Sequence, residues 1–284
     1  MRWLFILASM ANLLTFAHSG PVPSSTQDSI IAVPDLVSRA QPTSHRLLWK
    51  NTAPGVEIKG SKKLRILTVG DSITAGFPWR GDGNGYRGKL REDLSKNDVV
   101  FAGTITTDKS TMKGNHYAAW PGKTIKYISD RVDASLAQRP NIILLAAGTN
   151  DMNSNPDIAA EGNDPANAAA RLGNLIDKMV ANCPDATILV SLIMPTCGDS
   201  NHAAQNQRTA QFQKLTSEVV KKRFDANKKV LTADFVGFWP NLISNDCVHP
   251  SEAGYYKMGD SWYDFITQIP SGWIKAPTGP DPAH

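Results

Sequence analysis

The sequence predicts a three-layer α/β/α domain with five parallel strands in the order 2-1-3-4-5. From Leu64 onward, short apolar runs rich in branched residues alternate with amphipathic segments. The run Asn141–Ala147 is almost wholly apolar, which is typical of a strand buried on both faces of a parallel sheet. The connections are long enough to hold helices, and such crossovers join parallel strands with right-handed topology. A sheet of this kind binds ligands beyond the carboxyl ends of strands one and three.

The individual elements follow from the spacing of apolar residues. Five strands are expected at Leu64–Val69, Asp98–Ala102, Asn141–Ala147, Ala186–Met194 and Val230–Phe235. Helices are expected from about Ser72, over Tyr86–Lys96 and Thr124–Arg139, from Asp164 and Pro165 onward, and over Ala203–Asn227 and Ser251–Ile269. Pro165 suits the first position of a helix, and Ser251 is a favourable N-cap.

The first 63 of the 284 residues differ in composition from the rest. Residues 1–19 have a positive start, an apolar stretch and small residues at their end, which predicts a secretory signal peptide. The apolar stretch is short for a bilayer span, so a membrane anchor is the weaker alternative. Residues 20–63 are rich in proline, serine and threonine and are interpreted as an exposed leader or strap. The catalytic domain is expected at 64–270 and a tail at 271–284, in a secreted, extracellular protein.

Charge and hydropathy limit the expected partners. The net charge is +4, and no run of lysine or arginine resembles a nucleic-acid-binding stripe. Apart from the N-terminal stretch, no segment is apolar and long enough to cross a membrane. We therefore expect neither a nucleic-acid nor a membrane partner, and we expect a monomer.

The chain has three cysteines, and an oxidising destination favours one disulfide with one thiol left over. Cys197 follows the fourth strand, and Cys247 lies in a late loop at the same edge of the sheet. Cys183 precedes the fourth strand and so lies at the opposite edge. These positions predict a Cys197–Cys247 disulfide; the alternative is three buried free thiols.

Ser72 is the predicted nucleophile. It follows the first strand in the stretch Gly70-Asp71-Ser72, where a sharp turn leads into a helix. Backbone N–H groups point outward at such a place and favour a developing negative charge. A serine hydroxyl is a weak nucleophile unless a neighbouring base removes its proton.

His249 is the predicted base, and Asp246 is expected to orient it. The two residues are three apart in Asp246-Cys-Val-His249-Pro250, after the fifth strand and at the same sheet edge as Ser72. Three residues of loop allow the carboxylate to reach the imidazole Nδ1, as a serine, histidine and aspartate triad requires. His116 and His202 are rival bases, but the sequence places no carboxylate partner beside them.

Acyl transfer also needs hydrogen-bond donors for the oxyanion. The Ser72 backbone N–H and the Asn150 side-chain amide, which follows the third strand, are the first two candidates. The third is a glycine N–H, from Gly122 where a loop turns into a helix, or from Gly103 just after the second strand. Asn150 could instead be an ordinary turn residue of an Asn-Asp pair.

Four segments together resemble the SGNH (GDSL-type) hydrolases. They are Gly70-Asp-Ser-Ile-Thr74, Gly122, Gly148-Thr-Asn-Asp151 and Asp246-Cys-Val-His-Pro250, which are similar to blocks I, II, III and V and stand in the family order. The resemblance implies a flavodoxin-like sheet, Ser72 as nucleophile, Asp246 and His249 as its partners, and Gly122 and Asn150 as oxyanion donors. It also implies that no metal and no cofactor are needed.

Within that family, the segments around Gly85-Tyr-Arg87 and His116 to Ile125 most resemble carbohydrate esterase family 3, whose members are secreted acetylxylan esterases. Aromatic and arginine side chains suit sugar rings and their hydroxyls, although most such residues simply pack in a core. The substrate-binding candidates are Trp79, Arg80, Tyr86, Arg87, Trp120 and Trp239.

The function expected from these features is deacetylation of a polysaccharide such as acetylated xylan through an acyl-enzyme. One alternative is a lipase or lysophospholipase that acts on longer acyl esters. A second is a catalytically silent carbohydrate-binding protein on the same fold. A flavin or nucleotide site would need a glycine-rich phosphate loop, which the sequence lacks. A metal site built from Cys197, Cys247 and His249 would take the base out of action.

Overall fold

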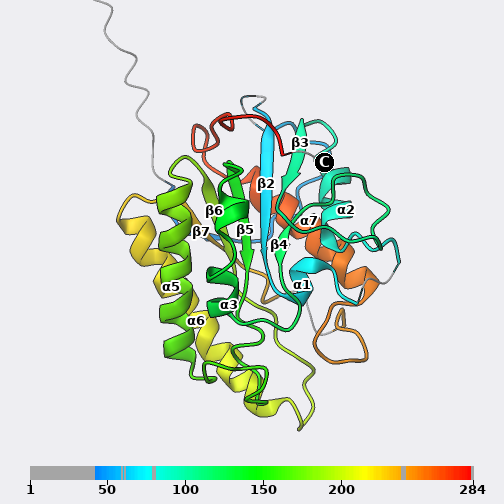
Figure 1. Ribbon diagram of the computed structural model, residues 1–284, viewed down its shortest axis with the longest axis vertical. Helices are drawn as coiled ribbons and strands as arrows, with labels where there is room; N and C mark the ends of the chain where they lie inside the picture. Colours follow the sequence, from blue (N-terminus) through cyan, green and yellow to red (C-terminus); the bar gives the residue numbers. More distant parts are fainter. Residues whose placement is uncertain (1–41, 59, 61, 79–80, 238–240, 283–284) are drawn as a thin grey trace, which may run out of the picture. The chain divides into compact units, whose positions relative to one another are not determined.

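The computed structural model describes residues 42–58, 60, 62–78, 81–237 and 241–282 (Figure 1). The predicted signal peptide and the first half of the leader lie outside them. Along the chain the elements are β1 (Arg46–Leu47), β2 (Leu64–Gly70), α1 (Ser72–Ala75), α2 (Tyr86–Asp93), β3 (Val99–Ala102), β4 (Ala118–Ala119), α3 (Ile125–Ser129), α4 (Asp133–Leu136), β5 (Ile142–Ala146), α5 (Pro165–Asn182), β6 (Thr187–Ser191), α6 (Ala203–Asp225), β7 (Val230–Ala233) and α7 (Glu252–Thr267).

The strands of the described residues form one sheet of seven, and every pairing between its strands is parallel. The order is β1-β7-β6-β5-β2-β3, with β4 also paired to β2. The five strands expected from sequence therefore take the predicted order 2-1-3-4-5. Two short strands are added. β1 comes from the leader, and β4 interrupts what was expected to be a continuous polar loop.

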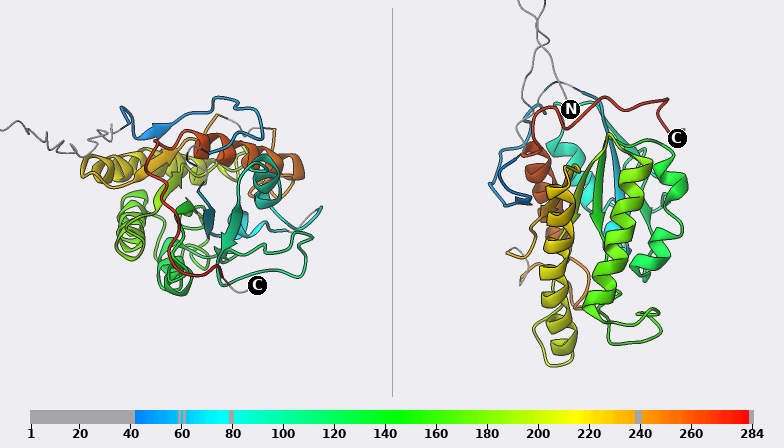
Figure 2. Two further views of the ribbon diagram at one scale, coloured as in Figure 1. Left: turned by 90° about the horizontal axis from the view of Figure 1, so that it is seen from above. Right: turned by 90° about the vertical axis from the view of Figure 1, so that its left-hand side faces the viewer.

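Two apolar cores fill the space between the sheet and its helices. On one face, α2 and α7 pack against alternate residues of β2 and against Phe235. On the other face, α3, α4 and α5 cover the intervening residues, and α6 packs against α5 and beside β7. Figure 2 shows α5 and α7 on opposite sides of the sheet. The three-layer arrangement is as predicted, because strands buried on both faces need helices on both sides.

Most helices begin where their sequence indicates. The Asp164 side chain accepts a hydrogen bond from Asn167 N–H and caps α5, with Pro165 at its first position. Ser251 caps α7 by accepting a hydrogen bond from Gly254 N–H. Both caps satisfy backbone N–H groups that a helix leaves unpaired at its start.

The single helix expected over Thr124–Arg139 is wrong, because the segment forms two short helices. The chain tightens after α3, where Arg131 N–H donates to the carbonyl of Ile128, three residues back. Lys178 of α5 donates its ammonium to the Ser129 carbonyl at 2.7 Å. The Lys178 ammonium therefore bonds to a carbonyl that would accept from Asp133 N–H in a continuous helix.

Segments on both sides of the expected domain lie against the sheet. β1 pairs with β7 through Arg46 opposite Thr232 and Leu47 opposite Ala233. In the tail, the carbonyls of Thr278 and Gly279 accept hydrogen bonds from the buried Arg65 guanidinium. The division into leader, domain and tail stays a prediction, but these parts of the leader and tail are packed. No helix of the described residues has the length and apolar character needed to cross a membrane.

Candidate active site

Three loops meet at the carboxyl ends of the central strands. Gly70, which ends β2, pairs with Ala119 of β4 on one side and with Ala146 of β5 on the other. Trp120 N–H also donates to the Gly70 carbonyl at 3.1 Å. The loops that begin at Asp71, Trp120 and Ala147 therefore leave the sheet side by side. They carry the serine, the glycine and the asparagine singled out from the sequence.

The turn after β2 holds Ser72 at the start of a short helix. Asp71 caps α1, because its Oδ1 accepts a hydrogen bond from Ile73 N–H at 3.0 Å. Gly76 ends the helix with a left-handed φ of 92°. Phe77 then folds back, and its N–H donates to the Ser72 carbonyl at 2.9 Å. These hydrogen bonds hold the backbone of Ser72, which is 7% exposed, and its hydroxyl points toward His249.

Ser72, His249 and Asp246 form a continuous chain of polar contacts. The Oγ of Ser72 lies 2.9 Å from Nε2 of His249. The Nδ1 of His249 lies 3.0 Å from Oδ2 of Asp246. A carboxylate only accepts hydrogen bonds, so Nδ1 carries the proton and Nε2 is left as an acceptor for the serine hydroxyl. This is the arrangement in which a histidine can act as a general base.

The carboxylate of Asp246 is held in its ionised form. Partial burial acts to raise its pKa, but hydrogen bonds from the backbone N–H groups of His249 and Val248 and from the Ser244 hydroxyl outweigh it. The resulting pKa is about 2. These three donors all reach Oδ1, at 2.9, 3.0 and 2.8 Å respectively. Oδ2 is left for the imidazole, so the loop separates the two tasks of the carboxylate.

A disulfide braces the same loop. Cys197, after β6, is bonded to Cys247, which stands between Asp246 and His249. Cys197 N–H also donates to the Cys247 carbonyl at 3.1 Å. The predicted pairing is confirmed, and Cys183 is the free, buried thiol. Burial raises the pKa of Cys183 to about 11, so this thiol stays protonated at neutral pH.

The structure separates the two glycines that were candidates for an oxyanion donor. Gly103 N–H donates to the Gln138 side chain at 2.7 Å, so it is already engaged. Gly122 has a left-handed φ of 72° and lies in the loop between β4 and α3. Within the described residues its N–H has no hydrogen-bond acceptor, and neither has the Ser72 N–H. Gly122 therefore remains the candidate donor and Gly103 does not.

Asn150 follows β5 and is anchored by its own amide. One N–H of its Nδ2 donates to the Lys123 carbonyl at 2.9 Å. This contact fixes the plane of the amide and leaves the second N–H for another acceptor. The simple turn-forming interpretation of Asn150 does not account for a side chain that reaches the neighbouring loop.

Two of the substrate-binding candidates are placed differently from the expectation. Tyr86 and Arg87 are both fully buried, so neither can line an open crevice. The Arg87 guanidinium donates to the carbonyls of Thr74 and Ala75 and to the Asn115 side chain, and it lies 4.4 Å from the centre of the Tyr117 ring. Arg87 therefore supports the end of α1 from inside. A sequence pattern does not distinguish such an arginine from one at the surface.

Trp120 is the remaining described candidate. It is partly buried at the start of the Gly122 loop, and its ring packs edge-on to Tyr127 at a centroid distance of 6.3 Å. Trp79, Arg80 and Trp239 lie outside the described residues. Phe77 was missed from the sequence, and its ring lies 5.0 Å from that of His249.

The two rival histidines are His116, which is half-buried, and His202. The Nδ1 of His202 lies 2.7 Å from Oδ1 of Asp199, so the expectation that His202 lacks a carboxylate partner is wrong. Ser72 nevertheless contacts His249. Cys197, Asp199 and Cys247 come close enough together to suggest a metal site. Their two sulfurs are joined in the disulfide, so they are not available as thiolate ligands.

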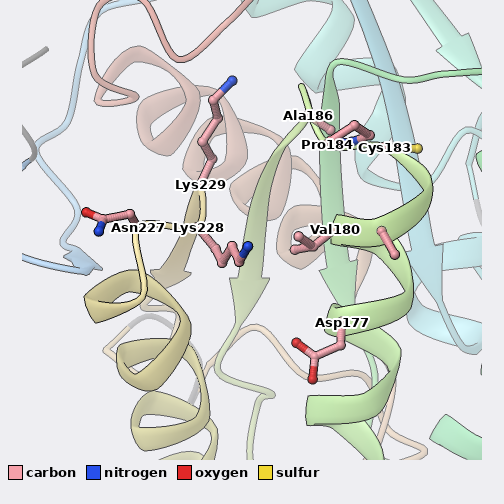
Figure 3. Close-up of a pocket in the computed structure, with 9 residues that line it drawn as sticks. Asp177, Val180, Cys183, Pro184, Ala186, Asn227, Lys228 and Lys229 are labelled. Carbon is pink, nitrogen blue, oxygen red and sulfur yellow. The ribbon is translucent and has the colours of Figure 1, made fainter.

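A groove of about 520 Å³ lies at the other edge of the sheet. It is bordered by the C-terminal end of α5, by the residues that precede β6, and by the residues between α6 and β7, among them Cys183, Pro184 and Lys228 (Figure 3). None of the triad residues lines it. A much smaller cavity beside the triad is lined by Asp71, Thr149 and Ser191. The contacts among Ser72, His249 and Asp246 thus lie away from the larger groove and beside the smaller cavity.

Comparison with known proteins gives the family. Residues 68–257 match the GDSL-like Lipase/Acylhydrolase family, which is more than half of the chain. The chain belongs to this family. The match begins inside β2 and ends inside α7, so it contains Ser72, Gly122, Asn150 and the Asp246–His249 loop. The family predicted from the four sequence segments is confirmed.

Individual relatives of this GDSL family member are carbohydrate esterases and a larger esterase. A family 3 carbohydrate esterase of Clostridium thermocellum is 25% identical, with a TM-score of 0.58 over 74% of this chain and 100% of its own. A family 3 carbohydrate esterase of Talaromyces cellulolyticus shares the fold, with 18% identity and a TM-score of 0.59 over 72% and 97%. A multidomain esterase of Ruminococcus flavefaciens is 26% identical over 244 residues. That alignment covers 76% of this chain, which therefore spans about a third (30%) of the curated relative's length.

Proposed function

We propose that the protein is a secreted serine esterase that removes acetyl groups from a polysaccharide such as acetylated xylan. The observation that carries the proposal is the continuous contact from Asp246 through His249 to Ser72, with distances of 3.0 and 2.9 Å. Membership of the GDSL-like Lipase/Acylhydrolase family supports acyl transfer as the reaction. The relatives include carbohydrate esterases, which favours a sugar ester as substrate.

The first half of the reaction forms an acyl-enzyme. Nε2 of His249 takes the hydroxyl proton of Ser72 while Oγ attacks the carbonyl carbon of the ester. The tetrahedral intermediate places its negative oxygen toward the Ser72 N–H, the Gly122 N–H and the free N–H of Asn150. The protonated imidazole, stabilised by Asp246, then gives its proton to the departing sugar oxygen. The acetyl group stays on Ser72.

The second half releases acetate. A water molecule gives a proton to Nε2 of His249 as its oxygen attacks the acetyl carbonyl. The same donors stabilise the second oxyanion, and the intermediate collapses with return of the proton from His249 to Oγ of Ser72. Acetate leaves, and the enzyme is restored. Every proton moves through His249, so the mechanism fails if Ser72 and His249 lose contact.

The decisive experiment compares the wild type with Ser72→Ala on acetylated xylan and on p-nitrophenyl acetate. Loss of nearly all activity in Ser72→Ala is expected, because removal of a catalytic group of a triad commonly costs several powers of ten in rate. Full activity of Ser72→Ala on either ester would overturn the mechanism. Failure of a fluorophosphonate probe to label the wild type at Ser72 would favour a silent carbohydrate-binding protein.

A chain-length series tests the substrate class. Acetyl, butanoyl and octanoyl esters of p-nitrophenol are compared by kcat/KM, and the acetyl ester is expected to be preferred. A preference for the octanoyl ester would instead identify a lipase or lysophospholipase. Secretion is tested separately, by expressing the full chain in a eukaryotic host and sequencing the N-terminus of exported protein. Cleavage before Gly20 is the expected result.

A further inference from the structure

Asp151 is a fully buried carboxylate next to Asn150, and the reaction proposed above does not use it. Its Oδ2 accepts a hydrogen bond from Ile125 N–H at 2.9 Å. Its Oδ1 accepts two from the guanidinium of Arg171, at 3.2 Å from Nε and 2.8 Å from Nη2. One carboxylate therefore links the loop after β5, the start of α3 and the middle of α5.

The neighbouring residue makes a second link to the same loop. Asn150 donates its amide to the Lys123 carbonyl at 2.9 Å, while Asp151 accepts from the N–H of Ile125. The pair thus holds the chain on either side of Thr124. Gly122 directly precedes Lys123, so two of the candidate oxyanion donors belong to one hydrogen-bonded unit although they come from different loops.

We propose that Asp151 and Arg171 are positioning residues that hold the Gly122 N–H and the Asn150 amide in the geometry that binds the oxyanion. This inference rests on the proposed function. A donor contributes only if it lies about 3 Å from the place that the oxygen occupies in the transition state, and loss of one donor costs about 10²–10³ in kcat. A misplacement of about 1 Å can cost about a hundredfold.

Arg171 is needed because Asp151 is buried. Burial acts to raise the pKa of Asp151, and the Ile125 N–H and Arg171 act to lower it, with the net pKa above its usual value. Without Arg171 the carboxylate would have no neighbouring positive charge among its described contacts, so it would take up a proton or draw in water. Either change weakens the hold on Ile125. Arg171 also reaches the carbonyls of Glu161 and Gly162 at 3.5 and 3.4 Å, so its loss would loosen that loop as well.

The chain offers a control in a second ion pair of α5, whose arginine is equally shielded. Arg223 of α6 contacts Asp177 of α5 through Nη2 and Oδ2 at 2.6 Å, and the Arg223 side chain is as shielded as that of Arg171 (14% and 16% exposed). Within the described residues its guanidinium bonds to Asp177 of α5 and to the Val219 carbonyl of α6, and not to the Gly122 or Asn150 loops. The partner carboxylates differ, because Asp177 is 60% exposed whereas Asp151 is fully buried. Arg223→Ala therefore measures the general effect of removing a shielded arginine that packs on α5, without uncovering the charge of a buried carboxylate.

The kinetic test uses p-nitrophenyl acetate and the full chain. Arg171→Ala is expected to lower kcat about tenfold or more with KM changed by less than about twofold, since the donors act mainly in the transition state. Arg171→Lys should recover part of kcat because its ammonium can still reach Oδ1. Asp151→Asn should also lower kcat, because an amide whose oxygen accepts from Ile125 N–H turns its own N–H groups toward the Arg171 guanidinium. Arg223→Ala should keep its kcat.

A second measurement does not depend on activity. Hydrogen exchange is followed by mass spectrometry in a peptide that contains residues 121–129, for the wild type and both arginine variants. Faster exchange in Arg171→Ala than in Arg223→Ala is expected. Equal exchange in the two variants would overturn the proposal, as would an unchanged kcat in Arg171→Ala. If the wild type shows no Ser72-dependent esterase activity, the proposed function fails. The exchange data alone then decide whether Asp151 and Arg171 hold the loop around Ile125 in place.

Discussion

Cys197 is covalently joined to Cys247, and Cys247 stands between Asp246 and His249, the proposed partners of Ser72. The disulfide connects the loop after β6 to the Asp246–His249 loop. Cys247 itself takes a left-handed backbone conformation, with a φ of 63°, and its N–H donates to the Ser244 carbonyl at 2.9 Å. The position of His249 relative to Ser72 therefore depends on a covalent link as well as on hydrogen bonds.

The first prediction concerns this disulfide. It closes a loop of 50 residues, and by loop entropy such a link stabilises the folded state by about 4 kcal/mol. The double variant Cys197→Ser with Cys247→Ser should unfold at lower urea concentration and have a lower kcat on p-nitrophenyl acetate. Dithiothreitol should lower the wild-type activity and leave that of the double variant unchanged. Cys183→Ala is the control, because it removes the free thiol and keeps the disulfide. An equal response of the wild type and the double variant to dithiothreitol would contradict the prediction.

The second prediction concerns the Asp246 carboxylate. Its pKa of about 2 lies below the usual range, so it stays ionised across the pH range in which most esterases are assayed. Asp246→Asn should lower kcat at least about a hundredfold at every pH between 5 and 9, since the amide neither fixes the required tautomer nor stabilises the imidazolium. The measurement is a pH–rate profile with circular dichroism as a check of folding. Recovery of wild-type kcat at alkaline pH would show that Asp246 is dispensable.

The third prediction concerns stability and pH. Burial, together with the nearby charge of Asp151, raises the pKa of Asp71 to about 7, although a hydrogen bond from Ile73 N–H opposes the shift. In the unfolded chain the same carboxyl has a pKa of about 3.9. The folded state therefore binds the proton more tightly, and this stabilisation is complete below about pH 4 and is lost as the pH rises toward 7.

Asp71→Asn tests this linkage, because an amide oxygen can still accept from Ile73 N–H but cannot ionise. Between pH 5 and pH 8, the free energy of unfolding of the variant relative to the wild type should rise by about 3 kcal/mol. Urea denaturation at the two pH values measures it. The exposed Asp108→Asn is the control and should show no such change. A constant difference between Asp71→Asn and the wild type would mean that Asp71 does not titrate in this range.

The fourth prediction separates packing from substrate binding at Arg87. Three of its nitrogens donate to buried acceptors, and a lysine cannot reproduce that planar fork. Arg87→Lys should lower the free energy of unfolding by about 3 kcal/mol, as expected when buried charge-assisted hydrogen bonds are lost. KM for acetylated xylan should change little. A large rise in KM without loss of stability would restore Arg87 as a substrate-binding residue.

The positions of the five main strands could be predicted because the sequence of a buried parallel strand is a run of apolar residues. Their order is the one that is common in doubly wound sheets, and the convergence of Ser72 and Asn150 followed from the common direction of β2 and β5. β4 could not be predicted, because two alanines inside a polar loop carry no periodicity. It pairs with the end of β2, whereas β3 pairs with the beginning, so one neighbour of β2 is made of two pieces.

Contacts between side chains and distant backbone were harder to predict. The break between α3 and α4 involves Lys178, almost 50 residues further along the chain, and local propensity does not report such a contact. The burial of Arg87 is of the same kind, since charged residues are usually exposed and only the acceptors around it explain its position. Asp151 stands directly after Asn150, but only the structure shows its link to Arg171.

β1 has a consequence for any shortened form of the protein. Residues Arg46 and Leu47 pair with β7 and cover what would otherwise be an edge strand of the sheet. A chain that started at Leu64, the first residue of the expected domain, would leave β7 as an exposed edge strand. The unpaired N–H and C=O groups of such a strand can pair with the same strand of another molecule. Such a truncated protein should self-associate during expression, whereas one that keeps Ser44 to Leu47 should remain dispersed.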